Sequence, residues 1–79
     1  MRIDKYLKVS RIIKRRTLAQ EACNAGFILL NGKEAKSSAK VKEGDVLEVN
    51  THGRSRRFEI VAVADTVAKQ DAASLYKEL

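Results

Sequence analysis

Residues 17–36 read TLAQEACNAGFILLNGKEAK, and their hydrophobic pattern changes from that of a helix to that of a strand at Gly26. Thr17 and Gln20 match a capping box, which predicts the start of the helix. Gly26 predicts its end, because glycine adopts the left-handed conformation of a helix terminus without steric cost. Apolar side chains share one face of a helix drawn at about 100° per residue. They are Leu18, Ala19, Ala22, Cys23 and Ala25.

After Gly26 the sequence predicts a β-hairpin. Phe27-Ile28-Leu29-Leu30 is a short apolar run, and Asn31-Gly32 tolerates the positive φ angles that a two-residue hairpin turn requires. Residues 33–36 are expected to return as the partner strand. A helix-turn-helix DNA-binding regulator would need a recognition helix in this place, so that class is the weaker alternative.

The preceding residues 1–16, MRIDKYLKVSRIIKRR, predict an amphipathic helix over roughly 3–10 and a tight connection over 11–16. One arc of the helix carries Ile3, Tyr6, Leu7, Val9 and Ser10, and the other carries Asp4, Lys5, Lys8 and Arg11. We therefore expect a basic outer face on the first helix.

The residues after the hairpin predict further strands. We expect a turn at 43–45, strands at 46–50 and 57–63, and a loop at 51–55 between them. In the tail, Asp65 is a candidate N-cap of a short helix. The apolar face of that helix comprises Ala68, Ala72, Leu75, Tyr76 and Leu79. The expected fold class is therefore α+β, with two N-terminal helices packed on a small, mostly antiparallel sheet and a short C-terminal helix.

The length of 79 residues suits one small domain over residues 1–64 and a helical tail over 65–79, packed on it or on a partner. One cysteine makes neither an internal disulfide nor a Cys-rich zinc cluster, which favours a reducing, cytoplasmic setting. Apolar runs fall well short of the ~20 residues that span a bilayer.

The positive charge is concentrated at the start of the chain. Residues 1–16 carry seven basic residues and one acidic residue, a net charge of +6, whereas residues 17–79 carry nine of each. Segregated charge creates a local positive field that attracts polyanions. An ordinary solvated helix face is the alternative interpretation of these residues.

Catalysis is not expected from the residues present. His52 is the only histidine and lies in a glycine-containing stretch, where one side chain makes neither a metal site nor a catalytic triad. Cys23 is expected to be a small packed hydrophobe. The four glycines are isolated, so no phosphate-binding glycine loop is indicated. We expect no enzyme, no metal and no cofactor.

RNA is the polyanion that suits this composition. Lysine and arginine neutralise phosphates, and arginine can also hold a phosphate through two hydrogen bonds. The only aromatic residues fall on faces assigned to the core, so single-strand binding by stacking is a poor fit. They are Tyr6, Phe27, Phe58 and Tyr76. Recognition of a folded RNA by shape and backbone is expected instead.

Several motifs, in order and spacing, resemble the S4 RNA-binding domain over residues 1 to about 50. They are Arg2-x-Asp4-x-x-Leu7, Arg15-Arg16-Thr17-x-Ala19, Gly26, Asn31-Gly32 and Val41-x-x-Gly44-Asp45. The resemblance implies two helices on a small sheet, the alpha-L RNA-binding motif. One residue departs from it, since Phe27 stands where the family commonly has a basic residue.

The opening residues are also similar to a family of free-standing, ribosome-associated quality-control factors. This resemblance implies a non-enzymatic, monomeric protein that binds large-subunit ribosomal RNA and P-site peptidyl-tRNA on stalled subunits. A quality-control factor that adds a C-terminal alanine tail is a candidate protein partner. The related fifteen-kilodalton heat-shock protein suggests subunit recycling as an alternative, and an RNA-modifying enzyme is weaker still.

The resemblance places Arg2 and Arg16 at positions expected to contact RNA phosphates. Asp4 either favours the helix N-terminus and pairs with Lys8, or orients an arginine for RNA. The full candidate RNA-binding set is Arg2, Asp4, Lys5, Lys8, Arg11, Lys14, Arg15 and Arg16, with Arg54, Arg56 and Arg57 as auxiliary contacts.

Overall fold

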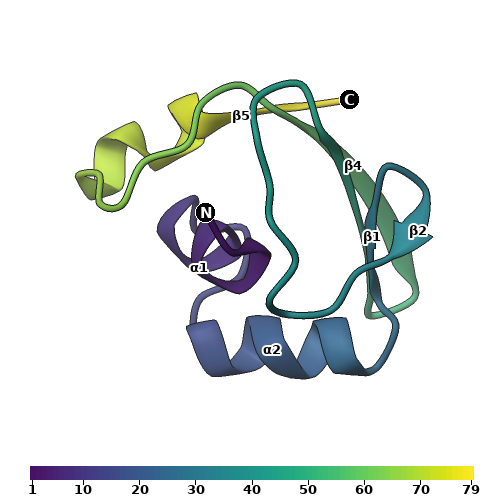
Figure 1. Cartoon of the computed structure of the whole chain (residues 1–79). Helices are drawn as coiled ribbons and strands as arrows, with labels where there is room; N and C mark the ends of the chain where they lie inside the picture. Colours follow the sequence, from purple (N-terminus) through teal and green to yellow (C-terminus); the bar gives the residue numbers. More distant parts are fainter.

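The chain forms a five-stranded antiparallel sheet with its helices gathered on one side (Figure 1). The computed structural model describes residues 1–79. The helices are α1 (Ile3–Val9), α2 (Arg16–Asn24) and the 3₁₀ helix η1 (Lys69–Leu75). The strands are β1 (Ile28–Leu30), β2 (Lys33–Glu34), β3 (Val46–Thr51), β4 (Arg54–Ile60) and β5 (Tyr76–Glu78), in the order β2-β1-β3-β4-β5. The predicted α+β class is confirmed, and no helix is long and apolar enough to cross a membrane.

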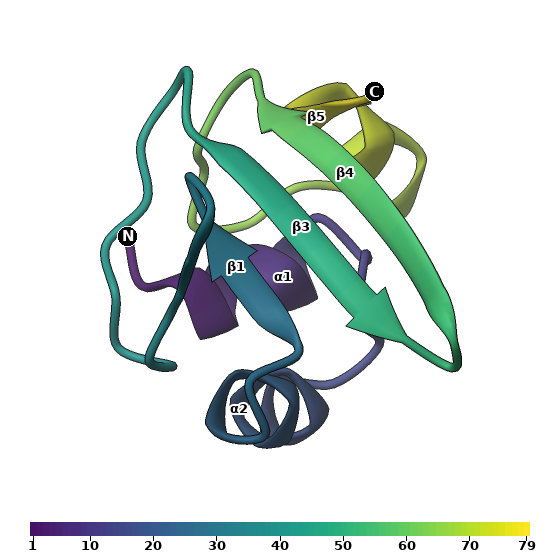
Figure 2. The same ribbon diagram turned by 90° about the vertical axis from the view of Figure 1, so that its right-hand side faces the viewer.

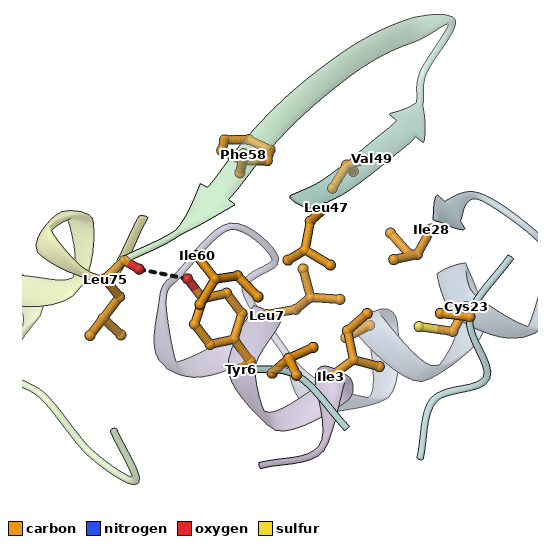
Figure 3. Packing of buried hydrophobic residues seen from close by; sticks show 13 residues of the cluster. Ile3, Tyr6, Leu7, Cys23, Ile28, Leu47, Val49, Phe58, Ile60 and Leu75 are labelled. Atoms are coloured by element: carbon orange, nitrogen blue, oxygen red, sulfur yellow. Dashed lines mark hydrogen bonds between the residues drawn. The ribbon is translucent and has the colours of Figure 1, made fainter. Parts of the chain in front are cut away.

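The core is built around α1, which lies behind β1 and β3 in Figure 2. Ile3, Tyr6 and Leu7 are fully buried and face Leu47 on β3 and Ile60 on β4 (Figure 3). A helix of only seven residues is marginal by itself in water, so tertiary packing stabilises it. The helix ends at Val9, a residue earlier than predicted.

The chain between β2 and β3 runs past the start of α1. The Ile3 amide donates to the carbonyl of Ala39 at 2.7 Å, and the Val41 amide donates to the carbonyl of Met1 at 2.9 Å. This irregular segment therefore runs alongside the first turn of α1 (Figure 1).

The start of α2 differs from the predicted capping box. The helix begins at Arg16, and its N-cap residue Arg15 makes no side-chain cap hydrogen bond. The Gln20 amide nitrogen donates instead to Asp4 across the helix pair, because a buried carboxylate needs donors and forms strong charge-assisted hydrogen bonds. Leu18 was expected in the core, but it is 46% exposed.

The end of α2 and the first hairpin are confirmed. Gly26 has φ +81°, a left-handed backbone conformation that residues other than glycine rarely adopt, so the position favours glycine. Asn31 and Gly32 both have positive φ and form the turn between β1 and β2. A strand rather than a recognition helix follows α2. Phe27 was assigned to the core, but it precedes buried Ile28 on the opposite face and is 47% exposed.

The second hairpin is tighter than predicted. His52 and Gly53 have φ of 54° and 71° and form a two-residue turn. β4 therefore begins at Arg54. The predictions of a five-residue loop at 51–55 and of a strand that starts at residue 57 are wrong. Continuous pairing from Val46↔Glu59 to Thr51↔Arg54 follows, because this turn matches the twist of the strands.

The tail is only partly helical. η1 has no side-chain cap, and Asp65 is not a cap, since it accepts from the Lys5 ammonium at 3.1 Å instead. Tyr76 begins β5, which pairs with the free edge of β4, so the predicted helical face does not extend to Tyr76 and Leu79. The Tyr6 hydroxyl donates to the Leu75 carbonyl at 2.7 Å and ties the tail to α1 (Figure 3).

Replacing Tyr6 by phenylalanine should lower the free energy of unfolding by about 0.5–1.5 kcal/mol, because one buried hydrogen bond is lost while the Leu75 carbonyl still accepts from the Val61 and Ala62 amides. Urea denaturation followed by circular dichroism measures the change. The control is Tyr76→Phe, since Tyr76 packs edge-to-face on Phe58 through its ring. Equal stability of the two variants would contradict the role of the Tyr6 hydroxyl.

Candidate nucleic-acid interface

A buried carboxylate joins α1 to α2. Asp4 is 0% exposed. Its Oδ2 accepts from Arg2 Nη2 at 3.1 Å and from Gln20 Nε2 at 3.0 Å. Its Oδ1 accepts from the Lys5 backbone amide at 2.7 Å and from Arg16 Nη2 at 3.4 Å. One side chain thus gathers two arginines that are 14 positions apart in sequence.

The prediction that Asp4 lies on the outer arc of α1 is wrong. The carboxylate is covered because α2 packs against α1 and the Asp4 amide donates to the carbonyl of Ser37 in the segment before β3. Its charged partners are Arg2 and Arg16 rather than Lys8, so the interpretation that it orients arginines holds. Whether those arginines contact RNA stays a prediction.

The network keeps Asp4 ionised. Burial by itself raises the pKa of the carboxyl, but hydrogen bonds from Gln20, Arg16 and the Lys5 amide together outweigh burial and lower the pKa. The Arg2 and Arg16 side chains remain 42% and 44% exposed. Since a guanidinium carries five N–H donors, each arginine can hold Asp4 and still bind an incoming anion.

A second group of cations lies along the connection between the helices. Lys8, Arg11 and Lys14 are exposed and line a shallow hollow of about 350 Å³. Asp65 shares this hollow and pairs with Lys5, so the tail partly neutralises it. Arg11 lies after the first helix, at the start of the predicted connection, and has φ 62°. Arg15 is exposed just before α2, and no contact groups it with the other cations.

The auxiliary arginines all lie on β4, including Arg54, which was predicted in the loop at 51–55. Arg56 makes two hydrogen bonds to Glu78, at 3.0 and 2.8 Å, and its guanidinium carbon lies 5.0 Å from the centre of the Phe58 ring. Arg54 and Arg57 are exposed. No contact joins these three residues to the arginines on Asp4, so the structure does not unite the main and auxiliary sets.

Sequence reasoning missed Gln20 as part of the network, because it was assigned to a capping box. Its spacing from Arg16 was the available signal, since residues four apart share one helix face. The residues considered for catalysis are unsuited to it. His52 is exposed in the second hairpin turn, and burial raises the pKa of the Cys23 thiol, with nearby Asp4 adding to the effect. No group of three or more potential metal ligands is present.

Replacing Asp4 by asparagine should cost about 1–3 kcal/mol at neutral pH, since the uncharged amide cannot satisfy both arginines. The folded-state pKa of Asp4 lies below its ordinary value of 3.8. Its contribution is therefore complete above that value and is lost as pH falls through the folded pKa. Urea unfolding at about pH 7 and about pH 3 should show the cost shrinking in acid. Asp65→Asn is the exposed control, and a pH-independent gap between wild type and Asp4→Asn would contradict this account.

Comparison with known proteins gives matches over most or all of the chain. The S4 domain family matches residues 1–47. The RQC P-site tRNA stabilizing factor of Halalkalibacterium halodurans is 51% identical over 77 residues, covering 98% of this chain and 88% of that protein. The protein of the same name from Bacillus subtilis is 47% identical over 76 residues, covering 96% and 88%.

A solved structure agrees with these sequence matches. Heat shock protein 15 of Vibrio cholerae, described as trimeric, superposes with a TM-score of 0.92 at 29% identity, covering 100% of this chain and 81% of that chain. The sequence motifs and the S4 family match both include the helix pair with Asp4 and Arg16, and Arg2 just before it. The chain therefore belongs to the S4 domain family, among the proteins named RQC P-site tRNA stabilizing factor.

Proposed function

We propose that this protein is a non-enzymatic RNA-binding factor of ribosome-associated quality control. In this role it binds the large ribosomal subunit and holds peptidyl-tRNA in the P site. The observation that carries the proposal is the pair Arg2 and Arg16 on one buried carboxylate. The names of the relatives that match nearly the whole chain support the choice of tRNA and ribosome as targets.

The arginine pair suits phosphates because it is pre-organised. Asp4 holds both guanidinium groups before RNA arrives, so less side-chain entropy is lost on binding than from freely rotating arginines. Arginine's planar fork matches the geometry of phosphate better than a lysine ammonium does.

The other cations would strengthen binding without base specificity. Exposed Lys8, Arg11, Lys14 and Arg15 release counterions when they approach a phosphate backbone, which also speeds encounter with RNA. Large-subunit ribosomal RNA and the tRNA backbone are both suitable partners for such a surface. The factor would act as a cytoplasmic, ribosome-associated monomer, alongside a factor that adds the C-terminal alanine tail.

Recycling of large subunits in heat shock is the second candidate function. It is favoured by the close superposition on heat shock protein 15 of Vibrio cholerae. The identity of 51% with the RQC P-site tRNA stabilizing factor of Halalkalibacterium halodurans, against 29% with the heat-shock protein, favours the quality-control role.

Replacing Arg16 by alanine should weaken binding to purified large subunits about tenfold, because a charge-assisted hydrogen bond to phosphate is worth about 1.5–3 kcal/mol. Arg2→Ala should behave alike. The slope of log affinity against log salt should also fall by about one for each lost contact. Co-sedimentation over a salt series measures both quantities.

Lys77→Ala is the charge-matched control, since Lys77 is exposed on β5 and has no ion-pair partner. It should bind like wild type. Unchanged binding of both arginine variants would overturn the site, and affinity independent of salt would overturn the phosphate surface as a whole.

Tagged protein recovered from cells should bring down large subunits that carry peptidyl-tRNA, because P-site tRNA is the proposed target. Northern blotting for tRNA and gradient sedimentation of the recovered particles make the measurement. Large subunits recovered without peptidyl-tRNA would favour the recycling role, and recovery of DNA would refute an RNA factor.

A further inference from the structure

An apolar groove lies between α2, the connection before it and the second hairpin. It has a volume of about 650 Å³, and eight of its 13 lining residues are hydrophobic. Phe27 and Leu18 line it and are 47% and 46% exposed. Val49 on β3 and Phe58 on β4 also line it. The groove therefore brings two large exposed apolar side chains together with the edge of the core.

The groove combines an apolar interior with polar groups suited to a nucleobase. A base has two flat apolar faces and a hydrogen-bonding edge, and RNA-binding proteins stack unpaired bases on aromatic rings. Phe27 offers such a ring, while the Glu21 carboxylate, the Thr51 hydroxyl and the His52 imidazole provide acceptors and donors along the lining. The volume lies within the range of small-molecule sites and accommodates a single base.

The charges around the groove suit the phosphates on either side of such a base. Lys14 and Arg56 line the groove together with one acidic residue, Glu21. Glu78 pairs with Arg56 and holds its guanidinium in place, so Lys14 is the unpaired cation of the lining. An apolar side chain of a protein partner would also fit the interior, but it would gain nothing from that cation.

The groove is continuous with the surface assigned to RNA. Lys14 lines both the groove and the hollow that holds Lys8 and Arg11. On α2, Leu18 and Glu21 lie about 200° and 140° around the helix from Arg16, so the groove and the Asp4 network occupy different faces. An RNA backbone that follows the cations from Arg11 to Lys14 would reach the groove directly.

We propose that this groove receives one unstacked RNA base, which packs on Phe27 while its flanking phosphates lie near Lys14 and Arg56. The inference rests on the proposed function, since it requires an RNA partner, and it adds a base contact to a surface otherwise suited to phosphates.

The test compares Phe27→Leu with Phe27→Trp in binding to purified large subunits that carry peptidyl-tRNA. Leucine keeps the groove apolar but removes the ring, and tryptophan keeps a ring. Loss of one stacked base should weaken binding about tenfold for Phe27→Leu, with the salt slope unchanged because no charge is lost. Phe27→Trp should retain wild-type affinity. Chemical probing of the RNA should show one base that wild type protects and Phe27→Leu leaves reactive.

Leu18→Glu is a second variant, at an exposed helix position that tolerates substitution, and it places a negative charge in the groove. It should weaken binding and abolish the same base protection. Urea unfolding confirms that each variant is folded. If Phe27→Leu and Leu18→Glu both bind like wild type, the inference is overturned. Weakened binding without any change in base reactivity also overturns it and identifies an apolar protein side chain as the occupant.

The outcomes separate this inference from the function on which it rests. Arg16→Ala weakens RNA binding and lowers the salt slope if the phosphate surface is correct, whatever the groove does. Loss at Arg16 with wild-type behaviour at Phe27 would retain the proposed function and refute the base site. Wild-type binding of the Arg16 and Phe27 variants together would refute both.

Discussion

The hydrogen bonds that converge on the Asp4 carboxylate organise the helical half of this protein. A charge buried without partners would be costly, and here four donors from α1, α2 and the N-terminal residue Arg2 surround it. The helices can satisfy that carboxylate only in one mutual arrangement. The same contacts hold the two arginines at the surface. One set of hydrogen bonds therefore stabilises the helix pair and orients the arginines that are proposed to bind phosphate.

The sheet half of the molecule depends on packing and on tight turns. Leu47 and Ile60 bury α1 from one side, and the Tyr6 hydroxyl connects α1 to the carbonyl of Leu75 in the tail. The tail in turn extends the sheet through β5. α2 presents Arg16 on one face and Leu18 on another, so the proposed phosphate contacts and the proposed base site lie on different faces of the helix. A small domain built in this way would combine charge-driven affinity with a local base contact.

Local patterns in the sequence predicted the features whose causes are local. Gly26 ends α2 and Asn31-Gly32 turns the first hairpin, since few residues other than glycine and asparagine adopt the conformations needed there. His52-Gly53 adopts the same kind of turn, but histidine is a weaker signal for positive φ than asparagine, so a longer loop was predicted. The tail was misread as a continuous helix because its apolar spacing does not reveal the free edge of β4.

The amino-acid pattern was enough to predict the α+β class, the order of the helices and strands up to β4, and the concentration of positive charge in residues 1–16. Which charges work together depends on the packing of the folded chain. Asp4 and Gln20 each have several partners within reach along the chain, and the choice of Arg2 and Arg16 depends on the packing of α2 against α1. Exposure of Phe27 was settled in the same way, because β1 has room for only one of two adjacent apolar residues on its buried face, and Ile28 occupies it.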